Sequence, residues 1–239
     1  MKIDSYYKKL NKKSQEIFLS SLENIQLLNR VHAIVVDFHK ISMMIPNMDD
    51  AKMFHLVCAQ LEASCLALTF GLYRPALSTL RLAFEFGMGG LYFSSNRLAQ
   101  REWENGNKEA DLKWSIINSP EDGVLSKRFG TAFFPGIAEY SLTYQEKSRE
   151  TYRCLSEYVH GNSDTWKISG LVLSKNQPLM DLYEKQISEI DEILKFAFCC
   201  RYLCELEKDQ LEDLQLILND KFTHIELIRT AFGGPKDIV

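Results

Sequence analysis

The stretch that decides the fold is Pro75-Ala76-Leu77-Ser78-Thr79-Leu80-Arg81-Leu82-Ala83-Phe84-Glu85-Phe86. When it is wound as a helix, Leu, Ala and Phe occupy nearly every side, which is typical of a helix buried among other helices. Pro75 suits a first-turn position, because its missing N–H group would have no partner there. The pattern predicts a central helix from about residue 75 to residue 94. Gly87, Gly89 and Gly90 lie toward its end, where we expect close packing of another helix.

The spacing of apolar residues predicts further helices on both sides of this one. We expect them over about Ser14–Met44, Asp50–Phe70, Asn96–Gly106, Lys108–Asn118, Ile137–His160, Leu179–Leu206 and Leu211–Thr230, with a brief helical segment that starts at Ser119. We also expect a break over Phe129–Gly136 and a loop over Asn162–Pro178, with one short strand at Trp166–Leu173.

These segments together predict an all-α fold, a bundle of about five or six long helices with short inserted helices and one loop. The chain of 239 residues has a length that favours a single domain over residues 1–239. We expect its core over about residues 50–205, with the helices at 14–44 and 211–230 packed on it.

The charge balance argues against bulk attraction to nucleic acid, since the formal net charge is −4. A polyanion would have to meet a local site instead. One basic cluster near the start of the sequence, Lys8, Lys9, Lys12 and Lys13, is interpreted as a solvated helical turn.

The start of the sequence has no apolar signal core, and no apolar run reaches the ~18 residues of a membrane span. We therefore predict a cytoplasmic protein without a membrane partner. The six cysteines lie in apolar helical stretches without a CxxC pattern, which favours buried, reduced thiols over a metal site. No metal and no cofactor are predicted.

One stretch carries residues suited to chemistry: Tyr152-Arg153-Cys154-Leu155-Ser156-Glu157-Tyr158-Val159-His160-Gly161-Asn162. Arg153 and His160 are seven residues apart, so both leave the same face of a helix, with Ser156 between them. A guanidinium can hold a phosphoryl group while an imidazole moves protons. The alternative is a histidine that caps helix carbonyls and an arginine that pairs with Glu157 or Glu150.

Arg81 and Glu85 form a second feature, because residues four apart are neighbours on one face of the central helix. Charges in such an apolar helix are costly unless they are paired or face a cavity. Either they form an internal salt bridge that fixes helix register, or they line a polar pocket.

The Arg153…His160 helix resembles the R-x(4–6)-H motif of HEPN-domain proteins, in its longest form. The stretch from Tyr73-Arg74-Pro75 to Arg81 and Glu85 also resembles the central helix of a bacterial group of uncharacterised HEPN-like proteins. In that group, such an Arg and Glu precede a segment similar to Leu155–Gly161. The resemblance covers about residues 50–205.

The resemblance implies a helical bundle that forms a homodimer and acts as a metal-independent endoribonuclease in a toxin–antitoxin or anti-phage defence system. It implies RNA as a partner, and an antitoxin or another defence protein as a second one. By this resemblance, His160 assists attack of a ribose 2′-hydroxyl or protonates the leaving oxygen, and Arg153 stabilises the charge on phosphorus. Arg81, Glu85 and Ser156 then orient these groups or line the cleft.

Two alternatives stay open at this stage. Cys154 stands where active members of the family often have a polar residue, and some relatives are non-catalytic modules that bind a partner protein or a nucleotide. A small-molecule enzyme that uses Arg81, Glu85 and His160 as a pocket is the other alternative.

Overall fold

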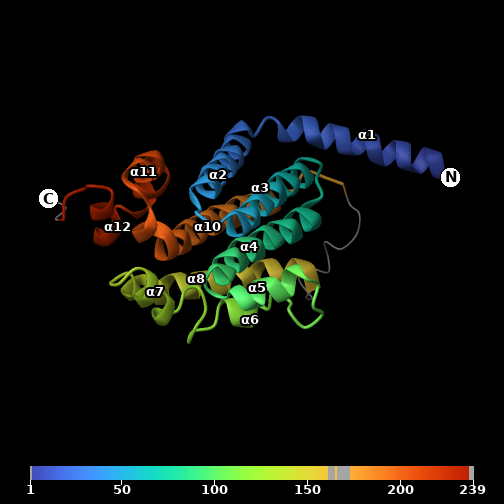
Figure 1. Cartoon of the computed structure of the whole chain (residues 1–239). Coiled ribbons are helices and arrows are strands. Elements are labelled where there is room, and N and C mark those ends of the chain that lie inside the picture. The colour runs from blue at the N-terminus through green and yellow to red at the C-terminus, as the bar shows by residue number, and fades with distance from the viewer. Residues whose placement is uncertain (1, 161–164, 166–172, 237–239) are drawn as a thin grey trace.

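The computed structural model describes residues 2–160, 165 and 173–236 of the chain, and this part is built from α-helices (Figure 1). No β-strand occurs among these residues, so the all-α prediction is confirmed. The strand expected at Trp166–Leu173, except for Leu173 itself, and most of the loop expected at Asn162–Pro178 lie outside the described residues.

The described helices follow one another along the chain. In chain order they are α1 (Ile3–Ser21), α2 (Ile25–Met44), α3 (Met48–Thr69), α4 (Tyr73–Ser95), α5 (Arg97–Glu104), α6 (Trp114–Ile117), α7 (Lys127–Phe133), α8 (Ala138–His160), α10 (Gln177–Tyr202), the 3-10 turn η1 (Leu203–Glu205), α11 (Lys208–Phe222) and α12 (Glu226–Ala231).

Helix α4 is the centre of the bundle and packs against α3, α8 and α10 (Figure 1). Its glycines are the points of closest approach. A Cβ atom on Gly87 would lie 2.6 Å from Leu194 of α10, and one on Gly90 would lie 2.6 Å from the Cβ atom of Met53 in α3. Close packing at these glycines, expected from the sequence, is confirmed, and it brings the backbones of three long helices together.

The single helix expected over Ser14–Met44 is wrong, because the chain breaks between Ser21 and Ile25. Asn24 has a ψ of 56°, outside the helical region. At about 100° per residue, the buried positions of α1 and α2 differ on average by about a quarter-turn, and the break lets each helix turn its own set toward the core. The buried positions are Ile17 and Ser21 in α1, and Leu27, Val31, Ile34, Val35, Phe38, Ile41 and Ser42 in α2.

The single helix expected over Leu211–Thr230 is also wrong, since α11 ends at Phe222 and α12 begins at Glu226. Between them, Ile225 takes an extended conformation and is buried in the core. The Arg229 guanidinium donates to the carbonyl of Thr223, an acceptor that the break leaves without its helical partner. Burial of Ile225 therefore outweighs continuation of the helix.

Two predictions between α5 and α8 need correction. The break expected over Phe129–Gly136 is mostly helix, because Ser126 caps α7 by accepting from the N–H group of Phe129 at 3.1 Å. The helix expected over Lys108–Asn118 is reduced to the single turn of α6, and the segment from Ser119 is a turn rather than a helix.

A buried charge network joins α10 to its neighbours α2 and α11. The Lys195 ammonium lies 2.6 Å from the Asp37 carboxylate and 2.8 Å from that of Asp191. Lys221 of α11 pairs with the same Asp191. Two lysines and two aspartates leave the network neutral, which removes much of the cost of burying it.

The prediction of buried thiols is confirmed at three of the six cysteines, and Cys65 and Cys154 are half-buried. Cys58, Cys199 and Cys200 are buried, whereas Cys204 in η1 is exposed, so the expectation of burial is wrong there. Burial raises the pKa of Cys58 and of Cys65 to about 11, which keeps both as thiols at neutral pH.

In the described part of the chain, none of the helices combines the length and apolar character that a bilayer span requires.

Gly90→Ala should lower the free energy of unfolding by about 1–2 kcal/mol in urea titrations. Overpacking against the Met53 Cβ atom costs about 1–3 kcal/mol, and the better helix propensity of alanine returns up to about 1. Gly89→Ala is the matched control, because its Cβ atom would meet only the end of the Leu112 side chain, 2.9 Å away. We expect it to be nearly neutral, and equal losses in both variants would contradict this account.

Candidate functional site

The two features that the sequence singled out meet where α4 and α8 pack together. Nη1 of Arg81 in α4 lies 3.3 Å from Nε2 of His160, the last residue of α8. An arginine can only donate, so this contact is a hydrogen bond when Nε2 is the accepting nitrogen of the ring. The sequence placed these residues on separate helices, and the tertiary structure makes them direct neighbours.

Tyr152 of α8, not singled out from the sequence, joins the two charged residues of α4. Nη2 of Arg81 donates to the Glu85 carboxylate at 2.9 Å and to the Tyr152 hydroxyl at 2.5 Å. The Tyr152 hydroxyl donates in turn to the same Glu85 oxygen at 2.9 Å. Burial, and then the Glu85 carboxylate, raise the pKa of Tyr152, so the phenol keeps the proton that it donates.

Aromatic stacking holds Tyr152 from the other side. Its ring lies 3.9 Å from that of Trp114 in α6, with an interplanar angle of 2°. The guanidinium carbon of Arg81 lies 4.5 Å from the Tyr152 ring centroid. The three groups form a stack in which the short helix α6 supplies the outer layer, and Phe84 of α4 contacts that layer in turn.

Arg81, Glu85, Tyr152 and His160 form one cluster, and solvent exposure separates it into an inner and an outer part. The side chains of Arg81 and Glu85 are 13% and 20% exposed, whereas His160 is exposed. The pair therefore forms the internal salt bridge that was one of the two alternatives, and it extends to α8 rather than staying within α4. Only the edge of the cluster, at His160, is open to solvent.

Arg74, also not singled out, fixes the end of α8. Its Nε donates to the carbonyl of Tyr158 at 2.7 Å, and its Nη2 donates to the carbonyl of Val159 at 3.4 Å. These carbonyls belong to the last turn, where a helix lacks internal donors and a cation is favoured. A second arginine of α4 thus anchors the backbone that carries His160. Capping of the helix carbonyls, the alternative role considered for His160, is carried out by Arg74.

Arg153 and Ser156 stand apart from this cluster. Arg153 is exposed, and among the described residues it has neither a hydrogen bond nor an ion pair, so the ion pair weighed with Glu157 or Glu150 is absent there. The Ser156 hydroxyl donates to the carbonyl of Tyr152 at 2.6 Å within its own helix. The structure therefore joins His160 to Arg81 and Glu85, and leaves Arg153 free for a ligand.

Sequence signals existed for two of the missed residues. Tyr152 precedes Arg153 directly, and Arg74 opens the central helix. Trp114 had no such signal, because its contact depends on how a short inserted segment folds back onto α8.

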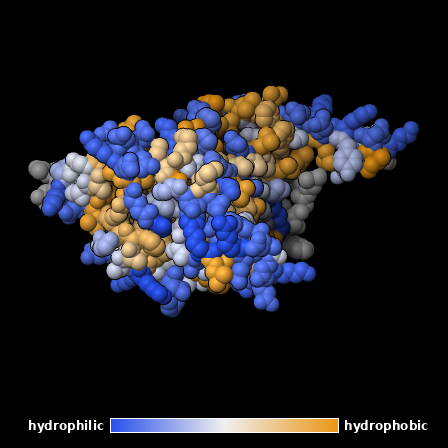
Figure 2. Space-filling view, in the orientation of Figure 1, coloured by the Kyte–Doolittle hydropathy of each residue, from blue (hydrophilic) through white to orange (hydrophobic). Residues whose placement is uncertain are grey.

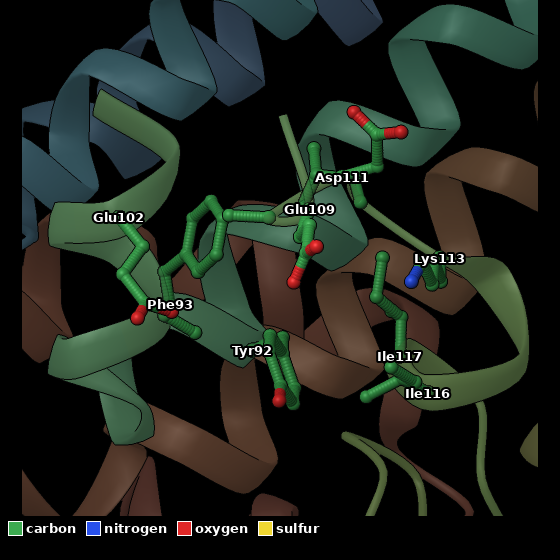
Figure 3. Close-up of a pocket in the computed structure, with 11 residues that line it drawn as sticks. Tyr92, Phe93, Glu102, Glu109, Asp111, Lys113, Ile116 and Ile117 are labelled. Atoms are coloured by element: carbon green, nitrogen blue, oxygen red, sulfur yellow. The ribbon is translucent and has the colours of Figure 1, made fainter. Parts of the chain in front are cut away.

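A separate pocket of about 150 Å³ lies between the end of α4, α5 and the segment before α6 (Figure 3). Tyr92 and Phe93 of α4 line one side, and Glu102, Glu109 and Asp111 bring carboxylates to its lining. None of the residues expected to act in catalysis belongs to it. The described residues also hold no group of three or more His, Cys, Asp or Glu side chains arranged to bind a metal ion.

Comparison with known proteins adds no relative: no family model, curated protein or solved structure matches the chain. The site is therefore interpreted from its own geometry.

Tyr152→Phe should lower the free energy of unfolding at pH 7 by about 1 kcal/mol, because it removes the hydroxyl that links Arg81 to Glu85. The matched control is Tyr158→Phe on the same helix, whose half-buried hydroxyl has no hydrogen bond in the described part of the chain. We expect urea titration to show a smaller loss for this control.

The pH dependence gives a second check. The pKa of Tyr152 is raised above its usual 10.0 in the folded state. The protonated hydroxyl therefore contributes fully to the free energy of unfolding below pH 10.0, and this contribution is lost as the pH rises through the folded pKa. The stability difference between wild type and Tyr152→Phe should therefore shrink in alkali. A difference that stays constant up to strongly alkaline pH would contradict the hydrogen-bonding role.

Proposed function

We propose that the chain is a metal-independent endoribonuclease of the HEPN type, an effector in a toxin–antitoxin or anti-phage defence system. The observation that carries this proposal is an exposed imidazole, His160, held 3.3 Å from a guanidinium at a helix end that Arg74 anchors. An imidazole in that position is open to an incoming phosphodiester. A homodimer in the cytoplasm is part of the same proposal.

The proposed reaction is an internal transesterification of RNA. A ribose 2′-oxygen loses its proton and attacks the adjacent phosphorus, and the bond to the 5′-oxygen breaks as that oxygen gains a proton. His160 serves one of these two proton transfers. Arg153, which is exposed and unpaired in the described part, stabilises the charge that gathers on the phosphoryl oxygens.

Arg81, Tyr152 and Glu85 act as positioning residues in this scheme. Arg81 bonds to Glu85 and Tyr152 and stacks on the Tyr152 ring, so its guanidinium has little freedom to move. Its Nη1 atom lies 3.3 Å from Nε2 of His160 and limits how the imidazole ring turns. Held in this way, the ring loses less conformational freedom when the substrate binds.

His160→Ala should reduce cleavage of a fluorescently labelled single-stranded RNA in EDTA by about 10²–10⁴-fold, the usual contribution of one acid or base. Arg153→Ala should cost about 10²–10³-fold. The matched control is Arg149→Ala, an exposed arginine one turn earlier on the same helix. The control should cleave like the wild type, and all three should keep the wild-type melting temperature.

Two results would count against the proposal. One is RNA that stays intact with pure wild-type protein and also with the partner encoded beside it. The other is equal activity of His160→Ala and wild type.

The second candidate function is a non-catalytic helical module that binds a partner protein or a nucleotide. It is favoured by an apolar groove of about 300 Å³ between α1, α2 and α3, into which Phe18, Val31 and the exposed Leu66 project. In this case Leu66→Glu should abolish capture of a partner, while His160→Ala should not. Affinity capture from cells with both variants separates the two functions.

A further inference from the structure

Helix α1 stands out from the bundle (Figure 1). We call residues 2–16 the arm. They are exposed except for Leu10 and Ser14, which are half-buried, and the two fully buried positions of α1 come later, at Ile17 and Ser21. The root of the helix docks through Phe18, whose ring lies 5.0 Å from that of Phe70. The arm itself therefore has most of its surface free for a partner.

The charge of the arm is opposite to that of the rest of the chain. It carries five lysines against Asp4 and Glu16, which gives 5 − 2 = +3, whereas the whole chain is −4 and the remainder is therefore −7. At about 100° per residue the four lysines within the helix, all but the N-cap residue Lys2, fall within an arc of about 140°, so they share one face. The lysines are Lys2, Lys8, Lys9, Lys12 and Lys13.

Few of these lysines are occupied. Lys8 lies 3.7 Å from Asp4, and Lys13 lies 3.3 Å from Glu16. Both are exposed pairs within one helix, which contribute little and dissociate readily. Lys2, Lys9 and Lys12 have no ion pair in the described part of the chain. The face can therefore take up phosphate groups at small cost.

Two tyrosines of the arm are open to solvent, Tyr6 at the edge of the lysine face and Tyr7 on the opposite side of the helix. Tyr6 is 38% and Tyr7 is 62% exposed, and their rings meet edge to face at 5.5 Å. Figure 2 shows the arm as mainly hydrophilic, in contrast to the hydrophobic patch where α1 meets α2. Lysines with an exposed aromatic ring at the edge of their face, here Tyr6, suit a single-stranded nucleic acid, because every base can stack on an aromatic face.

The root of the arm lies at the same end of the bundle as His160. Phe18 stacks on Phe70, directly after the end of α3, and Arg74 in the first turn of α4 binds the carbonyls at the end of α8. The turn between α3 and α4 thus contacts both the base of the arm and the last turn that carries His160.

We infer that the lysine face of the arm binds the phosphate backbone of single-stranded RNA and leads the strand toward His160. This inference rests on the proposed ribonuclease function, and it supplies a local basic surface on a chain whose net charge is −4. Strands long enough to reach both places benefit from the arm, whereas a dinucleotide occupies the cleavage site alone.

The test replaces Lys8, Lys9, Lys12 and Lys13 together by Gln. The matched control replaces four exposed lysines of the body by Gln, which changes the net charge equally: Lys52, Lys127, Lys185 and Lys208. Binding of polyuridylate is measured by fluorescence anisotropy at several salt concentrations, and cleavage of polyuridylate and of a dinucleotide is measured alongside. Circular dichroism and molar mass verify the fold and the oligomeric state of both variants.

The arm variant should bind polyuridylate at least about 10-fold more weakly, and the slope of log K against log salt should flatten by up to about 3, since each lost phosphate contact removes about 0.7. Its KM for polyuridylate should rise with kcat unchanged, and dinucleotide cleavage should stay at the wild-type rate. The control variant should match the wild type in each of these measurements.

The outcomes separate this inference from the proposed function. Arm-dependent binding without cleavage by the wild type supports the arm and contradicts the ribonuclease. Cleavage with the same KM and salt slope in the arm variant overturns the arm alone. Conversion of a wild-type dimer to a monomer by the arm substitutions also overturns it, because the arm would then join two copies of the chain.

Discussion

The close approach of three neighbours to α4 is the constraint on which the rest of the structure depends. Gly87, Gly89 and Gly90 leave room for α10, for the segment before α6 and for α3, so the second half of α4 is enclosed by backbone and apolar side chains. One turn earlier, the same helix carries Arg81 and Glu85. With α3 and α10 packed this closely, α8 is the neighbour that has to accommodate those charges, and it does so with Tyr152 and His160.

The bonds that the half-buried Arg81 guanidinium makes inside the protein affect the candidate site. Arg81 forms an ion pair with Glu85, donates a hydrogen bond to the Tyr152 hydroxyl and stacks on the Tyr152 ring. Its charge is therefore compensated inside the protein. The Nη1 group is directed at His160, where the cluster reaches solvent, and the buried Nε–H group has no hydrogen-bond partner among the described residues. A group that stabilises the packing of α4 on α8 thereby also holds the exposed imidazole in position.

For the binding of a polyanion, the positions of the charged residues matter more than the net charge of the chain. A net charge of −4 argues against a polyanion as ligand only if the charges are spread evenly. Here the positive charge gathers on an arm that leaves the bundle, and the body carries the compensating negative charge. Interpreting the lysines as a solvated turn was sound for the sequence alone, because nothing in it showed that the arm would stand clear of its own acidic body.

The sequence by itself determined the helical class, the bounds of α3, α4 and α8 to within a few residues, and the seven-residue spacing that sets Arg153 and His160 on one face. These properties follow from local periodicity and from capping, which depend on neighbours along the chain. Only the tertiary structure decided the breaks at residues 22–24 and 223–225, where burial of the next segment outweighs helix continuation. It alone also decided the contacts of Arg81 with His160 and of Trp114 with Tyr152, because each of these pairs joins segments whose distance in space depends on the packing of the whole bundle.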